Sequence, residues 1–249
     1  MHRRIGSSLM MRRYDNACLT RPTETPLALV IVNGVGFVPG FAALWPRATV
    51  TICADGGANK LHDVWKAKFV PQYVKGDLDS LRPEVADYFE SKGTVIVKDP
   101  DQESNDLDKC LHLLQTLQSS MADNIKLKVL VLGAMGGRFD QEIQNINALY
   151  RWSSVFESMT LFSDHTSATL LLPGTHLIRP NFDVETRTCG LIPLGGVCKS
   201  VTTKGLKWDM TDFETTIGGF VSTSNHCLSD EITVENSDPL VWTTELQPL

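Results

Sequence analysis

The chain has 249 residues, of which 42% are hydrophobic, and it carries a net charge of −6 with a pI of about 5.5. This length and apolar content are sufficient for a substantial core in one or two domains. An acidic chain is a poor candidate for non-specific nucleic-acid binding, which needs a basic surface. No apolar run has the length of about 20 residues that a membrane-spanning helix requires, so we expect no membrane partner.

The first residues of the chain are rich in arginine. The segment before Tyr14 contains Arg3, Arg4, Arg12 and Arg13 and no acidic residue. Arg-rich, acid-poor leaders occur in mitochondrial transit peptides, whereas chain termini are also often disordered. We expect residues 1–25 to be a disordered extension, and mitochondrial targeting remains the alternative.

The six cysteines bear on the redox environment of the protein. They form no C-x-x-C pair, which disfavours a zinc ribbon or a redox motif. We therefore expect six reduced thiols in a cytoplasmic protein.

Apolar runs alternate with helical patterns over residues 26–155. The runs that we expect to be strands cover residues 27–32, 49–54, 72–75, 93–97 and 128–132. Helical patterns begin near Pro83, Ser104 and Phe139. The second helix has a stripe formed by Leu107, Cys110, Leu111, Leu114 and Leu117, and in the third we expect Phe139, Ile143, Ile146 and Tyr150 to face the sheet. This alternation predicts an α/β domain with a mostly parallel, Rossmann-like sheet.

The pattern changes over residues 156–249. Thr, Val, Gly, Ser and Pro dominate there, and no helical stripe persists. Short candidate strands cover residues 176–179, 189–193, 201–203, 220–223, 232–235 and 241–245. Short strands at such spacing predict a C-terminal β-sandwich.

Four of the expected strands run directly into clusters of acidic residues and glycines. These clusters begin at Asp55, Gly76, Asp99 and Gly133. Parallel strands would bring all four to one edge of the sheet, where open α/β sheets bind ligands. Carboxylates bind hard cations, and glycines let the backbone approach phosphate, so the pattern predicts a site for a metal-bound polyphosphate. No P-loop and no complete dinucleotide-binding fingerprint occurs.

The strongest candidates for metal ligands are three aspartates. Asp77 and Asp79 are separated by one residue, so on an extended segment both side chains would point the same way. Asp106 lies at the start of an expected helix. Each of them has an ordinary alternative role as a turn, cap or helix-dipole residue, but their convergence would form a Mg²⁺ site.

Two further segments are candidates for ligand binding. Arg138 stands at an expected helix start, where a cation is unfavourable without an anionic partner, either a ligand or Asp140; a turn with a solvated arginine is the alternative. In the second region, Trp208, Ser222 and Asn225 could hold a planar heterocycle. Core packing and turn formation are the alternatives for these residues.

Seven motifs together resemble the eukaryotic thiamin pyrophosphokinase family. In chain order they are Cys53-Ala54-Asp55-Gly56-Gly57-Ala58-Asn59, Gly76-Asp77-Leu78-Asp79-Ser80, Asp101-Gln102 with Asp106, Gly137-Arg138-Phe139-Asp140-Gln141, Gly190-Leu191-Ile192-Pro193, Gly205-Leu206-Lys207-Trp208 and Ser222-Thr223-Ser224-Asn225. They follow the order of the family and cover nearly everything after residue 27. One departure is Asn105, where the family is expected to have threonine.

The resemblance implies transfer of a pyrophosphoryl group from ATP to the thiamin hydroxyl, with release of AMP. It implies a catalytic domain over residues 26–155, a thiamin-binding sandwich over 156–249, and a homodimer with a composite site. Its Mg²⁺-binding and catalytic positions correspond to Asp77, Asp79 and Asp106, with Arg138 also catalytic. Its ATP-binding positions correspond to Asp55, Gly56, Gly57, Asn59 and Gln102. Its thiamin-binding positions correspond to Asp140, Trp208, Ser222 and Asn225.

Two alternatives remain open at this point. One is a Mg²⁺-dependent pyrophosphokinase with another acceptor, against which Trp208 and the Ser222–Asn225 segment argue. The other is a non-catalytic thiamin-binding or sensor protein, which loss of a metal-binding acid would favour. All three acids are present.

Overall fold

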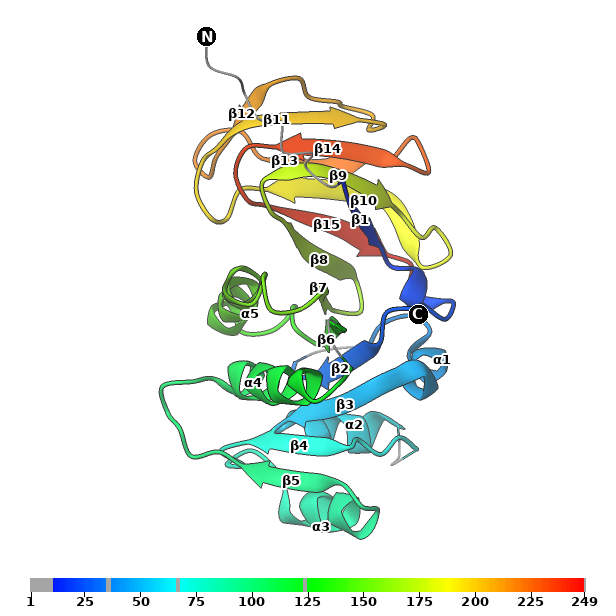
Figure 1. Cartoon of the computed structure of the whole chain (residues 1–249), viewed down its shortest axis with the longest axis vertical. Coiled ribbons are helices and arrows are strands. Elements are labelled where there is room, and N and C mark those ends of the chain that lie inside the picture. The colour runs from blue at the N-terminus through cyan, green and yellow to red at the C-terminus, as the bar shows by residue number, and fades with distance from the viewer. Residues whose placement is uncertain (1–10, 35–36, 66–67, 123–124, 249) are drawn as a thin grey trace. The chain divides into compact units, whose positions relative to one another are not determined.

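A computed structural model describes residues 11–34, 37–65, 68–122 and 125–248. The chain forms two compact units, each of which is described by itself. The α/β unit comprises residues 17–169 and 246–248, and the β unit comprises residues 11–16 and 170–245 (Figure 1).

The α/β unit is built on one mostly parallel sheet. Its strands are β2 (Leu27–Ile31), β3 (Ala48–Ala54), β4 (Tyr73–Gly76), β5 (Val95–Lys98), β6 (Lys128–Leu132), β7 (Ser158–Phe162) and β8 (Thr166–Leu171). They lie in the order β8-β7-β6-β2-β3-β4-β5. Every pair from β7 to β5 is parallel, and β8 is antiparallel to β7. All five residues of β2 are buried, as expected for a central strand.

Within the described residues, five helices connect these strands. They are α1 (Phe41–Leu44), α2 (Gly57–Trp65), α3 (Pro83–Ser91), α4 (Asp106–Ser119) and α5 (Phe139–Arg151), with the short 3₁₀ helices η1 (Ala17–Leu19) and η2 (Trp45–Arg47). Right-handed crossovers put α1 to α3 on one face of the sheet and α4 and α5 on the other. Figure 1 shows α4 in front of the strands and α2 behind them. The direction of chain progression reverses at β2, and ligands bind at such a reversal.

Helix α5 exists where the sequence predicted it, but its buried face is different. Phe139 is 75% exposed and Ile143 is 42% exposed, so the prediction that they face the sheet was wrong. Asn145, Ala148 and Leu149 are the buried residues of this helix. The Asn145 Nδ2 atom donates to the Ala134 carbonyl at 2.8 Å, which contributes to fixing the helix rotation around a polar residue.

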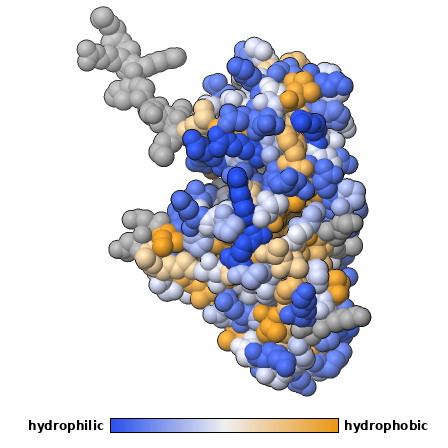
Figure 2. Space-filling view, turned by 90° about the vertical axis from the view of Figure 1, so that its right-hand side faces the viewer, coloured by the Kyte–Doolittle hydropathy of each residue, from blue (hydrophilic) through white to orange (hydrophobic). Residues whose placement is uncertain are grey.

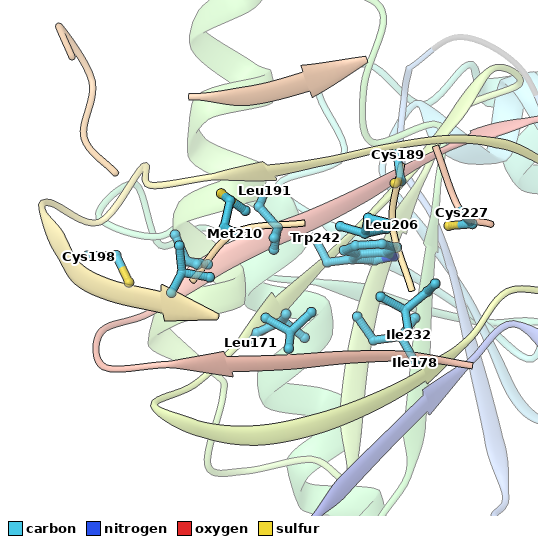
Figure 3. Packing of buried hydrophobic residues seen from close by; sticks show 13 residues of the cluster. Leu171, Ile178, Cys189, Leu191, Cys198, Leu206, Met210, Cys227, Ile232 and Trp242 are labelled. Atoms are coloured by element: carbon cyan, nitrogen blue, oxygen red, sulfur yellow. The ribbon is translucent and has the colours of Figure 1, made fainter. Parts of the chain in front are cut away.

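The β unit has two layers of strands. One layer has the order β1-β9-β14-β11-β12, and in the other β10 lies between β13 and β15. The bounds are β1 (Arg12–Asp15), β9 (Gly174–Arg179), β10 (Glu185–Ile192), β11 (Cys198–Lys204), β12 (Phe213–Thr215), β13 (Ser222–His226), β14 (Ile232–Asn236) and β15 (Leu240–Leu246). Apolar side chains from both layers form one core, in which Ile178 and Ile232 lie near Trp242 (Figure 3). The predicted α/β-plus-β-sandwich fold is confirmed.

The N-terminal segment is more ordered than expected. Residues 1–10 lie outside the described residues, whereas β1 pairs in parallel with β9, Tyr14 lying opposite Ile178. The Tyr14 ring contacts the buried His176 ring at 5.4 Å between centroids. Cys18 and Leu19 of η1 are buried. These apolar contacts explain why residues 11–25 are not the disordered extension that we expected.

The surface is mixed in polarity, and the cysteines are buried. Figure 2 shows hydrophilic residues over much of the displayed face, with hydrophobic residues scattered among them. In the described parts of the chain, no helix is long and apolar enough to cross a membrane. All six cysteines are buried and free of disulfides.

Candidate active site

A cavity of about 430 Å³ lies at the carboxyl ends of the central strands of the α/β unit. Residues that follow β2, β4 and β6 line it, including Asn33, Asp77 and Gly133. Gln102, Asp106 and Lys109 line it from the start of α4 and the segment before it. The sheet edge that the sequence predicted for ligand binding therefore carries a cavity lined by acids and glycines.

The acidic residues converge beside this cavity. Among the residues that the structure describes, Asp55, Asp77 and Asp79 bring one carboxylate oxygen each within 4.8 Å of the others. Asp106 lies next to this group: its Oδ1 atom is 3.0 Å from the position that a Cβ on residue 76 would occupy. Gly76 permits the approach, because that Cβ would also lie 2.8 Å from Asp55 Cβ. The structure thus groups Asp55, which the resemblance assigned to the nucleotide, with Asp77 and Asp79, whereas Asp106, the third predicted metal acid, lies beside that group and not within it.

A tight turn orients Asp77 and Asp79, not the extended segment that we expected. Leu78 has a positive φ of 66°, which is rare for a branched side chain. The Asp79 backbone N–H donates to Asp77 Oδ1 at 3.2 Å, and Ser80 Oγ donates to Asp79 Oδ1 at 2.9 Å. Asp55, at the end of β3, also has a positive φ of 41°. Backbone conformations of this kind are frequent at functional sites.

Burial and mutual repulsion change the acidity of these groups. Burial, helped by the nearby charges of Asp106, Asp79 and Asp77, raises the pKa of Asp55 to about 6 despite a hydrogen bond from Ser80 N. Burial also raises the pKa of Asp106 above its ordinary value. The backbone hydrogen bond from Asp79 lowers the pKa of Asp77. Burial and the neighbouring carboxylates therefore oppose ionisation of Asp55 and Asp106 in the metal-free protein.

The donor set fits a hard divalent cation. Asp55 is 3% exposed, and its Oδ1 atom is buried without a hydrogen-bond partner. A buried carboxylate oxygen without a partner is costly, and a cation among the acids would relieve that cost. Mg²⁺ favours carboxylate oxygens of this type.

The cluster contains one cation that we did not anticipate from the sequence. The Lys109 side chain is 3% exposed, and its Nζ atom lies 3.4 Å from Asp106 Oδ1 and 4.0 Å from Asp77 Oδ2. The sequence did contain a signal. Lys109 stands among the buried residues of α4, directly before Cys110, where a solvated lysine is not expected.

The predicted nucleotide-side residues have defined local roles. Gln102 Nε2 donates to Asp77 Oδ2 at 3.4 Å. Asn59 Nδ2 donates to the Ser80 carbonyl at 2.7 Å, so Asn59 supports the loop of Asp79. Gly57 starts α2 against β2, since a Cβ there would lie 2.2 Å from the Ile31 carbonyl oxygen. A Cβ on the adjacent Gly56 would lie 2.6 Å from Asn33 Nδ2.

The glycine-rich loop after β6 carries a positively charged and a negatively charged side chain. Arg138 and Asp140 form an exposed pair, with Arg138 Nε 3.1 Å from Asp140 Oδ1. The backbone N–H groups of Gly136 and Gly137 both donate to Glu142 Oε1, at 3.0 and 2.7 Å. Arg138 lines the cavity, so the pair leaves its guanidinium accessible to an anion.

Trp208 in the β unit is not a core residue. It is 54% exposed, and the Lys207 Nζ atom lies 4.5 Å from its ring centroid. Asn225 is 2% exposed and holds this loop: its Oδ1 accepts from Trp208 N at 3.2 Å and its Nδ2 donates to Trp208 O at 2.9 Å. Asn225 Nδ2 also donates to Ser222 Oγ at 3.3 Å. The three predicted thiamin-side residues of this unit therefore form one connected group.

Two family models match this chain. The thiamin pyrophosphokinase catalytic domain matches residues 41–162, and the thiamin pyrophosphokinase vitamin B1 binding domain matches residues 175–241. The chain belongs to the thiamin pyrophosphokinase family. The predicted family membership is confirmed, and the two matches fall within the α/β unit and the β unit respectively.

Several thiamin pyrophosphokinases are similar over most of their length. Thiamine pyrophosphokinase 1 of Oryza sativa subsp. japonica is 39% identical over 236 residues, which cover 88% of this chain and 87% of the relative. Thiamine pyrophosphokinase 2 of Arabidopsis thaliana is 36% identical and covers 98% of this chain and 93% of its own. The solved thiamin pyrophosphokinase from Candida albicans has a TM-score of 0.83 at 28% identity, covering 95% of this chain and 93% of that one.

Proposed function

We propose that this chain transfers a pyrophosphoryl group from ATP to the hydroxyl oxygen of thiamin, yielding thiamin diphosphate and AMP. Membership of the thiamin pyrophosphokinase family supports the reaction. The observation that carries the proposal is the acidic cluster beside the cavity, in which Asp55, Asp77 and Asp79 converge and one buried carboxylate oxygen lacks a partner. Such a donor set suits a metal-bound polyphosphate.

Asp55, Asp77, Asp79 and Asp106 would hold Mg²⁺. When bound, this ion neutralises phosphate oxygens and increases the electrophilicity of the phosphorus under attack. Gln102 supports the site by its hydrogen bond to Asp77.

The side chains of the α/β unit then position the phosphates and accept the proton. Lys109 and Arg138 line the cavity and offer N–H donors to phosphate oxygens as negative charge develops on them. A carboxylate of the cluster, with Asp79 the first candidate, orients the thiamin hydroxyl and accepts its proton as the oxygen attacks the β-phosphorus. The bond from that phosphorus to the oxygen bridging the α- and β-phosphates breaks, and this oxygen leaves with AMP. Positioning of this kind can supply much of the rate in phosphoryl transfer.

We assign thiamin recognition to the β unit. Trp208 presents an exposed aromatic surface on which a planar, cationic heterocycle can stack. Asn225 and Ser222 fix the Trp208 loop. Asp140 is a second candidate for a thiamin contact, provided that it exchanges its bond to Arg138.

The assembly and the location are also proposals. We propose a homodimer with a composite active site, which the family resemblance implies and which would contain two equivalent sites. We propose a cytoplasmic location, supported by six buried cysteines that form no disulfide.

One mixing experiment tests the function. The protein is incubated with ATP, Mg²⁺ and thiamin, and AMP and thiamin diphosphate are quantified, with the Asp79→Asn variant as the control. Equal amounts of both products are expected. Thiamin binding without turnover would favour a sensor protein, and AMP formation only with a different acceptor would favour another pyrophosphokinase.

A further inference from the structure

Lys109 is a fixed cation inside the acidic cluster. Both of its ion-pair partners, Asp106 and Asp77, are acids that we assign to the metal site. Helix α4 holds its backbone, since Leu107 and Cys110 on either side are buried and Cys110 Sγ donates to the Lys75 carbonyl. Its ammonium group is therefore a fixed positive charge in the site, whereas a metal ion can bind and dissociate.

The charges around this ammonium group set its effect on two different ligands. The Lys109 ammonium group lies within ion-pair distance of Asp106 and Asp77, and the carboxylates of Asp55 and Asp79 converge with that of Asp77. A free divalent cation is attracted by the carboxylates and repelled by Lys109. A metal–nucleotide complex still carries net negative charge on its phosphates, so Lys109 attracts it. Coulomb interaction alone therefore makes Lys109 weaken the binding of the free cation and strengthen the binding of the metal–nucleotide complex.

We propose that Lys109 makes the site selective for the metal–nucleotide complex over the free metal ion. By lowering the affinity for free Mg²⁺ and raising the affinity for Mg²⁺ bound to a polyphosphate, it makes the metal enter together with its nucleotide. This inference rests on the proposed function, and it concerns which form of the metal the site accepts.

A purely structural lysine would behave differently. Breaking a buried ion pair leaves carboxylates without a partner and loosens the local structure. Loss of such a pair would weaken the binding of both ligands, because both use the same acids. Removal of the lysine charge should therefore raise the affinity for free Mg²⁺ if Lys109 sets selectivity, and lower it if Lys109 is purely structural.

The test compares two affinities in Lys109→Met, which removes the charge and keeps much of the side-chain length. Calorimetry measures the binding of free Mg²⁺, and then of Mg²⁺ with α,β-methylene-ATP, whose α–β bridge resists transfer. A unit charge at this distance changes proton affinity by about 10-fold or more. We expect Mg²⁺ to bind at least about 10-fold more tightly and the complex at least about 10-fold more weakly.

Two control variants accompany this measurement. Lys109→Arg keeps the charge and should keep the ratio of the two affinities within about threefold of the wild-type ratio. A threefold change is small compared with the 10-fold or larger effect of a neighbouring charge. Lys75→Met removes a comparable pair outside the cluster, with Asp99 at 2.8 Å, and should also keep that ratio. If Lys109→Met does not fold, Lys109→Gln replaces it.

Three results would overturn the proposal while leaving the metal site in place. They are weakening of both affinities in the neutral variant, no change in either, and the same change in Lys75→Met. Absence of Mg²⁺ binding to the wild-type protein would overturn both the proposal and the metal site. Opposite shifts in a protein that forms no thiamin diphosphate would support the selectivity while rejecting the proposed reaction.

Discussion

Asn105 caps the start of α4, and Asp108 holds the Asn105 side chain in place. Asp108 N donates to Asn105 Oδ1 at 2.9 Å, and Asn105 Nδ2 donates to Asp108 Oδ2 at 2.8 Å. Asp108 also accepts from Arg151 Nη1 at 2.6 Å and from Trp152 Nε1 at 2.8 Å. The first turn of α4, which carries Asp106, is thereby bound to the end of α5.

Asp108→Ala should destabilise the protein by about 2–4 kcal/mol, because it removes the acceptor of several donors and leaves the buried Trp152 Nε1 without a partner. Denaturant unfolding in Mg²⁺-free buffer measures the loss. Trp152→Phe, which removes one of the donors, should cost less than Asp108→Ala. Equal costs would mean that Asp108 contributes only through the tryptophan.

Asp79→Asn should reduce turnover by roughly 100-fold or more while the fold is kept, because a neutral amide is a poor ligand for Mg²⁺. Steady-state formation of thiamin diphosphate at saturating Mg²⁺ provides the measurement. Asp87→Asn on α3, also an exposed acid, serves as the control. Near-normal turnover of Asp79→Asn would exclude Asp79 from the metal site.

The stability of the metal-free protein should depend on pH through Asp55. Its pKa is about 6 in the folded protein and about 3.9 when unfolded. Between these values only the folded state holds the proton, so stability falls as pH rises from about 4 to 6, and the contribution is lost above that. Asp55→Asn should flatten this slope and stabilise the protein by about 1–3 kcal/mol at pH 7.5 in EDTA.

Denaturant unfolding across this pH range, with and without Mg²⁺, tests that expectation. Mg²⁺ should remove the difference between wild type and Asp55→Asn by restoring a partner to the ionised carboxylate. An unchanged slope in the variant would assign the pH dependence to other groups.

Trp208→Ala should raise the KM for thiamin by up to about 10-fold, the value of a lost stacking contact, with a smaller change in the KM for ATP. Because Trp208 is exposed, the unfolding free energy should change little. Trp242→Ala is the matched control, since Trp242 is 5% exposed in the core and its loss should cost about 3–5 kcal/mol. Parallel changes in both KM values would argue against a thiamin contact.

Subunit mixing tests the composite site. Asp79→Asn protein is mixed with Trp208→Ala/Asn225→Ala protein, which lacks both the ring and the residue that holds its loop, under conditions that exchange subunits and at a thiamin concentration where neither variant alone is appreciably active. If each site uses both chains, a mixed dimer has one intact site, and statistical exchange should restore about a quarter of wild-type activity. Verified exchange with no recovered activity would assign each site to a single chain.

The α/β framework could be predicted because strands and helices have separate periodicities. The stripe on α4 gave the correct buried face at Leu107, Cys110, Leu111 and Leu114. The same reasoning was wrong for α5, where the large apolar residues Phe139 and Ile143 are exposed and Asn145 is buried. Periodicity indicates that a helix exists, but burial of a polar residue depends on a partner elsewhere in the chain.

The proposed metal site could also be predicted only in part. Asp77 and Asp79 could be proposed from their spacing, whereas the grouping of Asp55 with them depends on the pairing of β3 with β4 and on the small size of Gly76. Lys109 could not be assigned to the cluster, because its contact with Asp77 joins two segments that sequence alone does not align.

The pairing of β1 with β9 has a consequence for biosynthesis. Residues 12–15 leave the ribosome well before β9, the strand that they join, which ends at Arg179. At about 5–20 residues per second, that partner follows roughly 10–30 s later, while the segments between them can already fold. The β unit is therefore completed by segments that lie far apart in the chain, and we expect it to become resistant to protease later than the α/β unit.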